Sequence, residues 1–156
     1  MIPQKQDAMI PQKQMDELSN GECLRLLGSH MFGRLAFMDH VGVLPMIIPV
    51  NYVLVGDRIT FRTGAGSKLG NALRGEPVAF EVDGLDPADR TGWSVVVRGH
   101  AAVVTDTKEL ASLGDTPLQP WAPGTKPHYV RIEPRRISGR RIRQPQIDAP
   151  ADYWWG

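Results

Sequence analysis

The sequence predicts a mainly β domain, folded as a six-stranded antiparallel barrel with small helices. Short runs of β-branched and aromatic residues recur along the chain, and most are joined by links of hairpin length. Helical patterns are short, and no regular alternation of strand and helix favours a parallel sheet. The predicted strands span residues 33–38, 43–54, 58–63, 77–82, 93–104 and 128–143.

A short helix precedes the first strand. Ser19 and Glu22 have the spacing of a capping box, so the helix begins near residue 20. Its apolar residues follow at helical spacing, and Gly28 and Gly33 end the pattern. Those residues are Cys23, Leu24, Leu26 and Leu27. Cys23 is expected to pack in the core.

The second predicted strand, residues 43–54, contains two prolines. Pro45 and Pro49 cannot donate hydrogen bonds to a neighbouring strand, so this strand is bent or has an open edge. Residues 55–58 then form a hairpin turn to the next strand. Two further helices are predicted at residues 68–74 and 107–113.

The chain divides into three parts. Residues 1–17 contain the sequence MIPQKQ twice and are predicted to be a disordered N-terminal extension. Residues 18–143 form the barrel domain. Residues 144–156 are a C-terminal tail, whose final aromatic residues are expected to pack on the body or at a subunit contact.

The composition limits the classes of partner. Eighteen Lys and Arg residues balance seventeen Asp and Glu residues, so a global electrostatic attraction to nucleic acid or to an anionic membrane is not expected. One cysteine favours the cytoplasm, and the sequence contains no predicted secretory signal or membrane span. Dispersed histidines predict no metal site. These are His30, His40, His100 and His128.

The stretch FRTGAGSKL, residues 61–69, brings hydroxyl and amino groups to the start of a helix. Ser67 occupies an N-cap position and Lys68 follows it, while Thr63 ends the preceding strand. These groups and the helix N-terminus can converge on a small anion. A capped surface helix with a solvated lysine explains the local pattern equally well.

Five segments in order resemble the flavin-binding split-barrel superfamily, and within it the pyridoxamine 5′-phosphate oxidase-related branch. The segments are GRLAF, PMIIPVNYVL, ITFRTGAGSKL, PVAFEVD and GWSVVVRGHA. The resemblance implies a homodimer that holds FMN in clefts between subunits, and F420 is the alternative cofactor. It implies that the residues contacting the cofactor are Pro49, Val50, Asn51, Tyr52, Thr63, Ser67, Lys68, Trp93 and Ser94.

The chain departs from true pyridoxamine-phosphate oxidases in its second strand, which ends without a basic residue. Oxidation of pyridoxamine phosphate is therefore not expected. The predicted site for the cofactor phosphate also has no arginine beside Lys68. Arg34, Arg62 or Arg74 is a candidate to supply that positive charge.

The predicted function is a flavin- or F420-dependent oxidoreductase that acts on a small redox substrate. No side chain is expected to be catalytic, because the cofactor carries the redox chemistry. A non-catalytic flavin or F420 carrier or sensor is the alternative.

Six arginines lie between Arg131 and Arg143, and they have three possible roles. They are edge-strand charges or form inter-subunit salt bridges, they contact the cofactor, or they bind nucleic acid.

Overall fold

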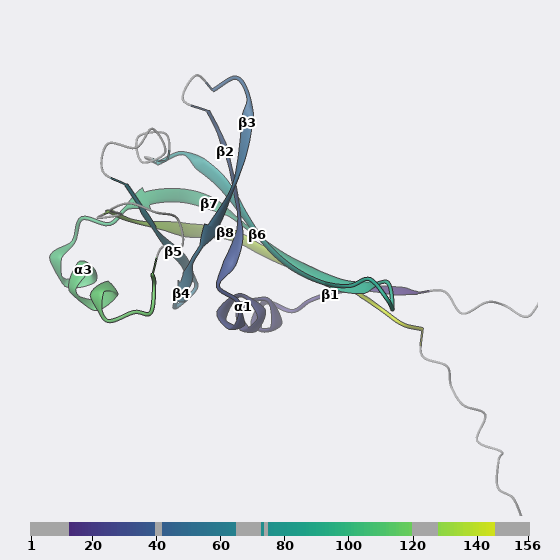
Figure 1. Ribbon diagram of the computed structural model, residues 1–156. Helices are drawn as coiled ribbons and strands as arrows, with labels where there is room; N and C mark the ends of the chain where they lie inside the picture. Colours follow the sequence, from purple (N-terminus) through teal and green to yellow (C-terminus); the bar gives the residue numbers. More distant parts are fainter. Residues whose placement is uncertain (1–12, 40–41, 65–72, 74, 120–127, 146–156) are drawn as a thin grey trace, which may run out of the picture.

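The computed structural model describes residues 13–39, 42–64, 73, 75–119 and 128–145. The architecture is a curled antiparallel sheet with short helices beside it (Figure 1). The elements in chain order are β1 (Gln14–Glu17), α1 (Asn20–Ser29), β2 (Phe32–Met38), β3 (Pro45–Asn51), β4 (Val53–Val55), β5 (Arg58–Thr63), β6 (Pro77–Asp86), β7 (Thr91–Val103), α3 (Thr107–Gly114) and β8 (His128–Arg143).

The strand order makes the sheet a split barrel. The order is β3-β2-β6-β7-β8-β5-β4, and β1 pairs with β8 in addition. β3 and β4 stand at opposite ends of this order, yet Tyr52 alone separates them in the chain. The sheet therefore returns on itself through the backbone at Tyr52, which confirms the predicted mainly β, split-barrel fold.

The predicted strand over residues 43–54 is two strands, β3 and β4, with a bend at Tyr52. Pro45 begins β3 and Pro49 lies opposite Arg34 of β2. β3 pairs with β2 and stands at the end of the strand order. Proline is tolerated at such an edge because no neighbouring strand needs its missing N–H.

β6 and β7 extend beyond their predicted ends and form an arm with β8 and β1 (Figure 1). The predicted strands end at residue 82 and begin at residue 93, whereas the two strands continue to Asp86 and start at Thr91. Arg90, in the turn between them, has a φ of 53°. β1 was not predicted; its Met15 lies opposite Ile142 of β8.

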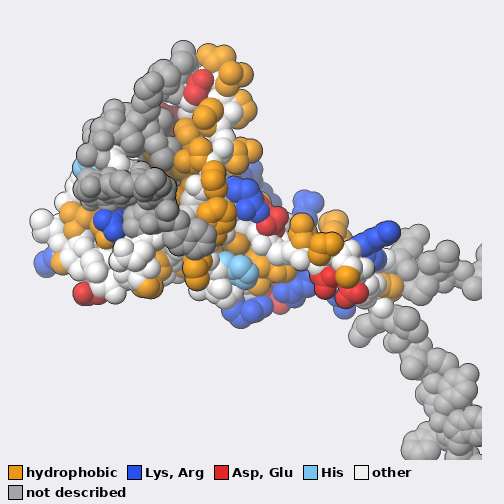
Figure 2. Space-filling model, in the orientation of Figure 1, with side chains coloured by type: hydrophobic (Ala, Val, Ile, Leu, Met, Phe, Trp, Pro, Cys, Tyr) orange, Lys and Arg blue, Asp and Glu red, His pale blue; other side chains and the backbone are white. Residues whose placement is uncertain are grey.

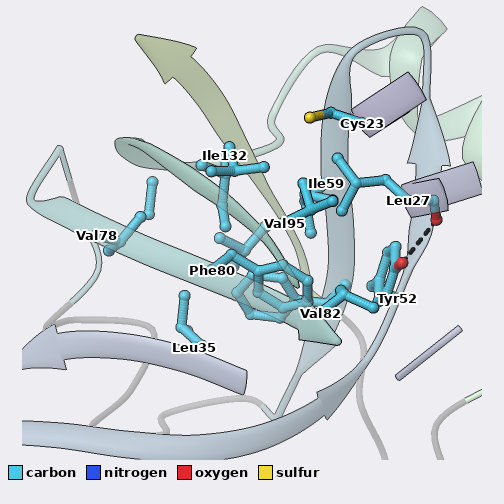
Figure 3. Close-up of a cluster of buried hydrophobic side chains, with 14 of the residues drawn as sticks. Cys23, Leu27, Leu35, Tyr52, Ile59, Val78, Phe80, Val82, Val95 and Ile132 are labelled. Atoms are coloured by element: carbon cyan, nitrogen blue, oxygen red, sulfur yellow. Dashed lines mark hydrogen bonds between the residues drawn. The ribbon is translucent and has the colours of Figure 1, made fainter. Parts of the chain in front are cut away.

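The core lies inside the curl of the sheet and is closed by α1. Leu27 of α1 is fully buried with Ile59 and Phe80 of the sheet (Figure 3). Cys23 is also fully buried, as predicted, and burial raises the pKa of its thiol. A side chain at Gly139 would place its Cβ 2.7 Å from Cys23 Sγ, so β8 approaches α1 closely there.

The helix starts agree with their sequence signals. Ser19 and Glu22 form the predicted capping box of α1, with N···O distances of 3.1 and 3.2 Å. Asp106 caps α3 by accepting from the Glu109 N–H at 2.9 Å. Most of the predicted helix at 68–74 lies outside the described residues. Neither described helix has the length and hydropathy to cross a membrane.

Candidate functional site

Tyr52 fixes the corner between β3 and β4. Its backbone N–H donates to the Met31 carbonyl at 2.9 Å, and its hydroxyl donates to the Leu27 carbonyl at 2.6 Å (Figure 3). The last carbonyls of a helix have no partner within it, so the Tyr52 hydroxyl satisfies one of these groups of α1. The ring packs edge-on against Phe80 with centroids 5.0 Å apart. Tyr52 therefore pins the corner to the core, and desolvation raises the pKa of its hydroxyl.

The segment before this corner has an open side. Pro49, Val50 and Asn51 pair with β2 on one side, and no described strand pairs with β3 on the other. In an antiparallel pair, successive residues direct backbone groups alternately toward and away from the partner strand. The Tyr52 N–H points to Met31 on the β2 side, so Val50 also faces β2, and the backbone N–H and C=O groups of Asn51 are directed to the open side.

The Asn51 side chain is held in place. Its Nδ2 donates to the Gln119 carbonyl at 2.6 Å, across a separation of 68 residues. This contact ties the segment after α3 to the end of β3. Gln119 thus borders the open side of β3.

Thr63 ends β5 and is buried, with 4% of its surface exposed. It lies opposite His128, the first residue of β8. Ser67 and Lys68, which were predicted to hold the cofactor phosphate, lie outside the described residues.

Trp93 and Ser94 occupy the opposite end of the sheet from Thr63. They lie opposite Arg141 and Arg140, near the end of β8, whereas Thr63 lies opposite its beginning. Roughly twelve residues of strand at about 3.3 Å each separate the two groups by about 40 Å along β8. One chain therefore does not bring Trp93 and Ser94 to the segment that contains Thr63.

Trp93 is partly buried, and its ring packs against neighbours in its own chain. Its ring meets the His30 ring at 4.8 Å between centroids, with an interplanar angle of 68°. A Cβ at Gly84, opposite Trp93 on β6, would lie 2.6 Å from the indole nitrogen. Ser94 follows on the other face of β7, because neighbouring residues of a strand alternate between faces.

Arg34, a candidate for the missing phosphate charge, is committed elsewhere. Its Nε lies 3.0 Å from Glu81 Oε2, and its Nη2 contacts Asp83. Burial raises the pKa of the Glu81 carboxyl, as does Asp83, while Arg34 opposes this. Arg62 lies over the Tyr129 ring at 5.2 Å, and Arg74 lies outside the described residues.

Within-chain ion pairs account for part of the arginine run. Arg131 Nη1 lies 2.7 Å from Glu109 Oε2, and its Nε lies 2.6 Å from Glu133 Oε1. Arg143 Nε lies 2.5 Å from Asp16 of β1. β8 pairs with β5 over residues 128–132 and with β1 over residues 140–143, so Arg131, Arg140, Arg141 and Arg143 are not edge-strand charges. Arg135 and Arg136 lie between these ranges, where β7 is the one described strand that pairs with β8.

Sequence reasoning missed the groups that hold Tyr52 in place. The Met31 and Leu27 carbonyls are backbone atoms from a distant element, and no local pattern indicates them. The described residues contain no group of three or more His, Cys, Asp or Glu side chains arranged to hold a metal ion. In the described part of the chain, the predicted cofactor-contact residues thus fall into two places: the β3–β4 corner with the end of β5, and the arm.

The comparisons with known proteins agree with this architecture. Residues 19–141 match the family described as pyridoxamine 5′-phosphate oxidase. An uncharacterised protein of Mycobacterium tuberculosis, Rv0080, is 40% identical over 135 residues, which are 83% of this chain and 87% of that protein.

Solved structures show the same fold. The FAD binding protein from Mycobacterium smegmatis has 37% sequence identity and a TM-score of 0.69, over 81% of this chain and 98% of that one. A protein from Mesorhizobium loti, described as FAD-binding, has 24% identity and a TM-score of 0.66, over 85% of this chain and 100% of that one. At that identity, the second likeness bears on the fold alone.

Proposed function

Because this chain belongs to the pyridoxamine 5′-phosphate oxidase family, we propose that it binds a flavin and acts as a flavin- or deazaflavin-dependent oxidoreductase on a small redox substrate. FMN is the proposed cofactor and F420 the alternative. The related Mycobacterium smegmatis protein, which is described as FAD binding, supports a flavin.

The observation that carries this proposal is the open side of β3. A flavin ring presents carbonyl and N–H groups along one edge, and backbone groups of a strand can pair with them as a neighbouring strand would. Asn51 directs such groups to this side, beside a corner that Tyr52 fixes. A rigid backbone edge orients the ring without using a titratable side chain.

A homodimer completes the proposed site. Trp93 and Ser94 reach a flavin at the β3 edge when a second copy of the chain supplies them, because they lie far from Thr63 in their own chain. Large apolar side chains gather over the β2–β3 hairpin (Figure 2) and support a subunit contact there. The exposed ones are Met31, Phe32, Met38, Val43, Leu44, Met46 and Ile47.

The bound flavin supplies hydride or electron transfer, and the chain's own residues bind and orient it. Tyr52 holds the corner, and the Asn51 contact with Gln119 keeps the neighbouring segment beside the edge. Residue contacts of this kind also suit a carrier or sensor. Flavin reduction followed by turnover with an acceptor distinguishes an oxidoreductase from either.

Pyridoxamine phosphate is not the proposed substrate. A substrate phosphate needs its own cation, and β3 and β4 carry none, while Arg34 opposite Pro49 is bound to two carboxylates. We expect the FMN-loaded protein to form no hydrogen peroxide when pyridoxamine 5′-phosphate is added. Robust peroxide production would contradict the assignment.

Substitution of Ser67 and Lys68 tests the flavin proposal. The double variant Ser67→Ala/Lys68→Ala is expected to weaken FMN binding by at least about tenfold, because a charge-assisted phosphate contact is lost. Lys108→Ala, an exposed lysine on α3, is the matched control and should bind FMN as the wild type does. Equal FMN affinities in all three proteins would disprove the phosphate assignment. The absorption spectrum and mass of any ligand released on denaturation distinguish FMN, FAD and F420.

A further inference from the structure

An ion pair with Arg131 of β8 ties α3 to the sheet (Figure 1). Arg131 Nη1 lies 2.7 Å from Glu109 Oε2, and the two side chains are 23% and 27% exposed. An ion pair that is largely shielded from water is screened less by solvent and salt than a fully exposed one. Because Glu109 lies in the first turn of α3, this pair holds the beginning of the helix against β8.

The guanidinium of Arg131 is itself oriented by the sheet. Its Nε lies 2.6 Å from Glu133 Oε1, and the second oxygen of Glu133 lies 3.1 Å from Arg58 Nε. Two cations and two carboxylates therefore alternate from β5 through β8 to α3. A network of this kind holds its members more firmly than an isolated surface pair does. The sheet thus directs Arg131 at Glu109.

The apolar anchors of α3 lie at its other end. Leu113 is 2% exposed and is the one buried residue of this helix, which is described over its whole length. Leu118, beyond the helix, is 4% exposed. The ion pair with Arg131 and these two leucines therefore fix α3 at both of its ends.

The segment after α3 extends this fixed position to β3. The Thr116 N–H and hydroxyl both donate to the Leu113 carbonyl, at 3.1 and 2.7 Å, so the chain turns directly after the helix. Three residues later, the Gln119 carbonyl accepts from Asn51 Nδ2 at 2.6 Å. The end of β3 is therefore linked to α3.

Asn51 belongs both to this link and to the open side of β3. Its backbone N–H and C=O groups are directed to the open side, and its side chain holds Gln119. A shift of α3 would move Gln119, and Asn51 would then lose its side-chain partner or move with it. The position of α3 thus bears on the backbone groups that the proposed flavin uses.

We propose that Arg131 is a positioning residue for the flavin ring, which acts through Glu109 and α3 on the contact between Gln119 and Asn51. The inference rests on the proposed flavin site at the edge of β3. Arg131 lies opposite Thr60 and Ala102 in the sheet, neither of which is a predicted cofactor-contact residue. Its role is to hold the wall of the site, and not to contact the flavin.

Riboflavin binding tests this role, because riboflavin has the flavin ring without the phosphate. Its affinity therefore reports on the ring and not on the predicted phosphate site. Glu109→Ala should lower the riboflavin affinity about fivefold, because α3 loses its ion pair with the sheet. Arg131→Met should have a similar effect. Arg131→Lys keeps a positive charge near Glu109 and should retain most of the wild-type affinity.

A double-mutant cycle with Asn51→Ala separates positioning from a general loss of stability. Asn51→Ala keeps the backbone groups of β3 but removes the bond to Gln119, so it should lower the riboflavin affinity at least as much as Glu109→Ala does. Glu109→Ala should cause no further loss in the Asn51→Ala background, because α3 is already uncoupled from β3. Losses that multiply in the double variant would overturn the proposal.

Hydrogen exchange without flavin gives a readout that does not depend on binding. Residues 46–51 should exchange faster in Glu109→Ala than in the wild type. The matched control is Asp115→Ala, which removes the same charge from an exposed position directly after α3 and should leave both exchange and riboflavin affinity unchanged. Wild-type exchange at residues 46–51 in Glu109→Ala would contradict the link between α3 and β3.

The binding results also separate this role from the proposed function. Equal losses of riboflavin affinity in Asp115→Ala and Glu109→Ala, or no loss in Glu109→Ala, would overturn the positioning role of Arg131 and leave the flavin proposal intact. A wild type that binds neither FMN nor riboflavin would disprove the proposed function, and this role with it.

Discussion

At the scale of single residues, Tyr52 joins the fold to the proposed site. Its hydroxyl and its N–H bond to two backbone carbonyls, of Leu27 and Met31, that precede it by more than twenty residues in the chain. The Pro45 and Pro49 pattern predicted a bend in this strand but not its position. The position depends on the contact with the end of α1, which local propensity does not encode.

Replacing Tyr52 with phenylalanine should cost about 1–2 kcal/mol of unfolding free energy at neutral pH, because the buried Leu27 carbonyl loses its donor. Burial raises the pKa of Tyr52 in the folded chain, whereas the unfolded chain releases this proton near pH 10. Stability from this hydroxyl is therefore complete below about pH 10 and is lost as the pH rises further.

Urea unfolding at a series of pH values measures this effect. The stability difference between wild type and Tyr52→Phe should narrow above about pH 10. Tyr129→Phe, at a half-buried tyrosine whose hydroxyl makes no hydrogen bond within the described residues, is the control and should cost less. A difference that stays constant with pH would refute the role given to the Tyr52 hydroxyl.

At the scale of elements, the pairing of β7 with β8 organises the molecule. β8 carries the arginine run, the contact with α1 and a bulge where its register with β7 shifts between Arg98 and Gly99, and it also pairs with β1. The sequence predicted β8 as one long strand, because its apolar and β-branched residues extend to its end. It did not predict β1, because three of its four residues are polar and the segment gains its structure from pairing with a distant strand.

Gly99→Ala should destabilise the protein by more than about 2 kcal/mol, because the new methyl group would overlap the Glu133 carbonyl at the bulge. Gly21→Ala is the matched control. Gly21 lies in the first turn of α1 with no atom within 4 Å of the added Cβ, so alanine should stabilise the protein by up to about 1 kcal/mol. Thermal unfolding of both variants measures the contrast, and an unchanged Tm for Gly99→Ala would show that the strands can separate at this point.

The candidate site was predictable only in part, because part of it depends on long-range strand pairing. The segment containing Pro49, Val50 and Asn51 is placed on an open edge, as the prolines indicated. The distance between Thr63 and Trp93 along β8 was not predictable from their motifs, because it depends on the register of β5 and β7 against β8. Register is set by long-range pairing, which a single sequence does not display.

At the scale of the whole molecule, the account depends on two copies of the chain. The exposed apolar side chains of the β2–β3 hairpin favour a contact between copies, and Ile47 is the most exposed of them at 69%. Ile47→Glu should therefore give a folded monomer, because a charge at the centre of an apolar contact has no partner. Leu85→Glu, on the exposed arm at 75%, is the control and should leave the dimer intact.

Sedimentation velocity with detection at the visible flavin absorbance tests the central claim most directly. The account predicts that FMN co-sediments with the dimer of the wild type and of Leu85→Glu, at one flavin per chain, and not with the Ile47→Glu monomer. FMN that co-sediments with a folded monomer at wild-type affinity would show that one chain forms the whole site, and would contradict the account.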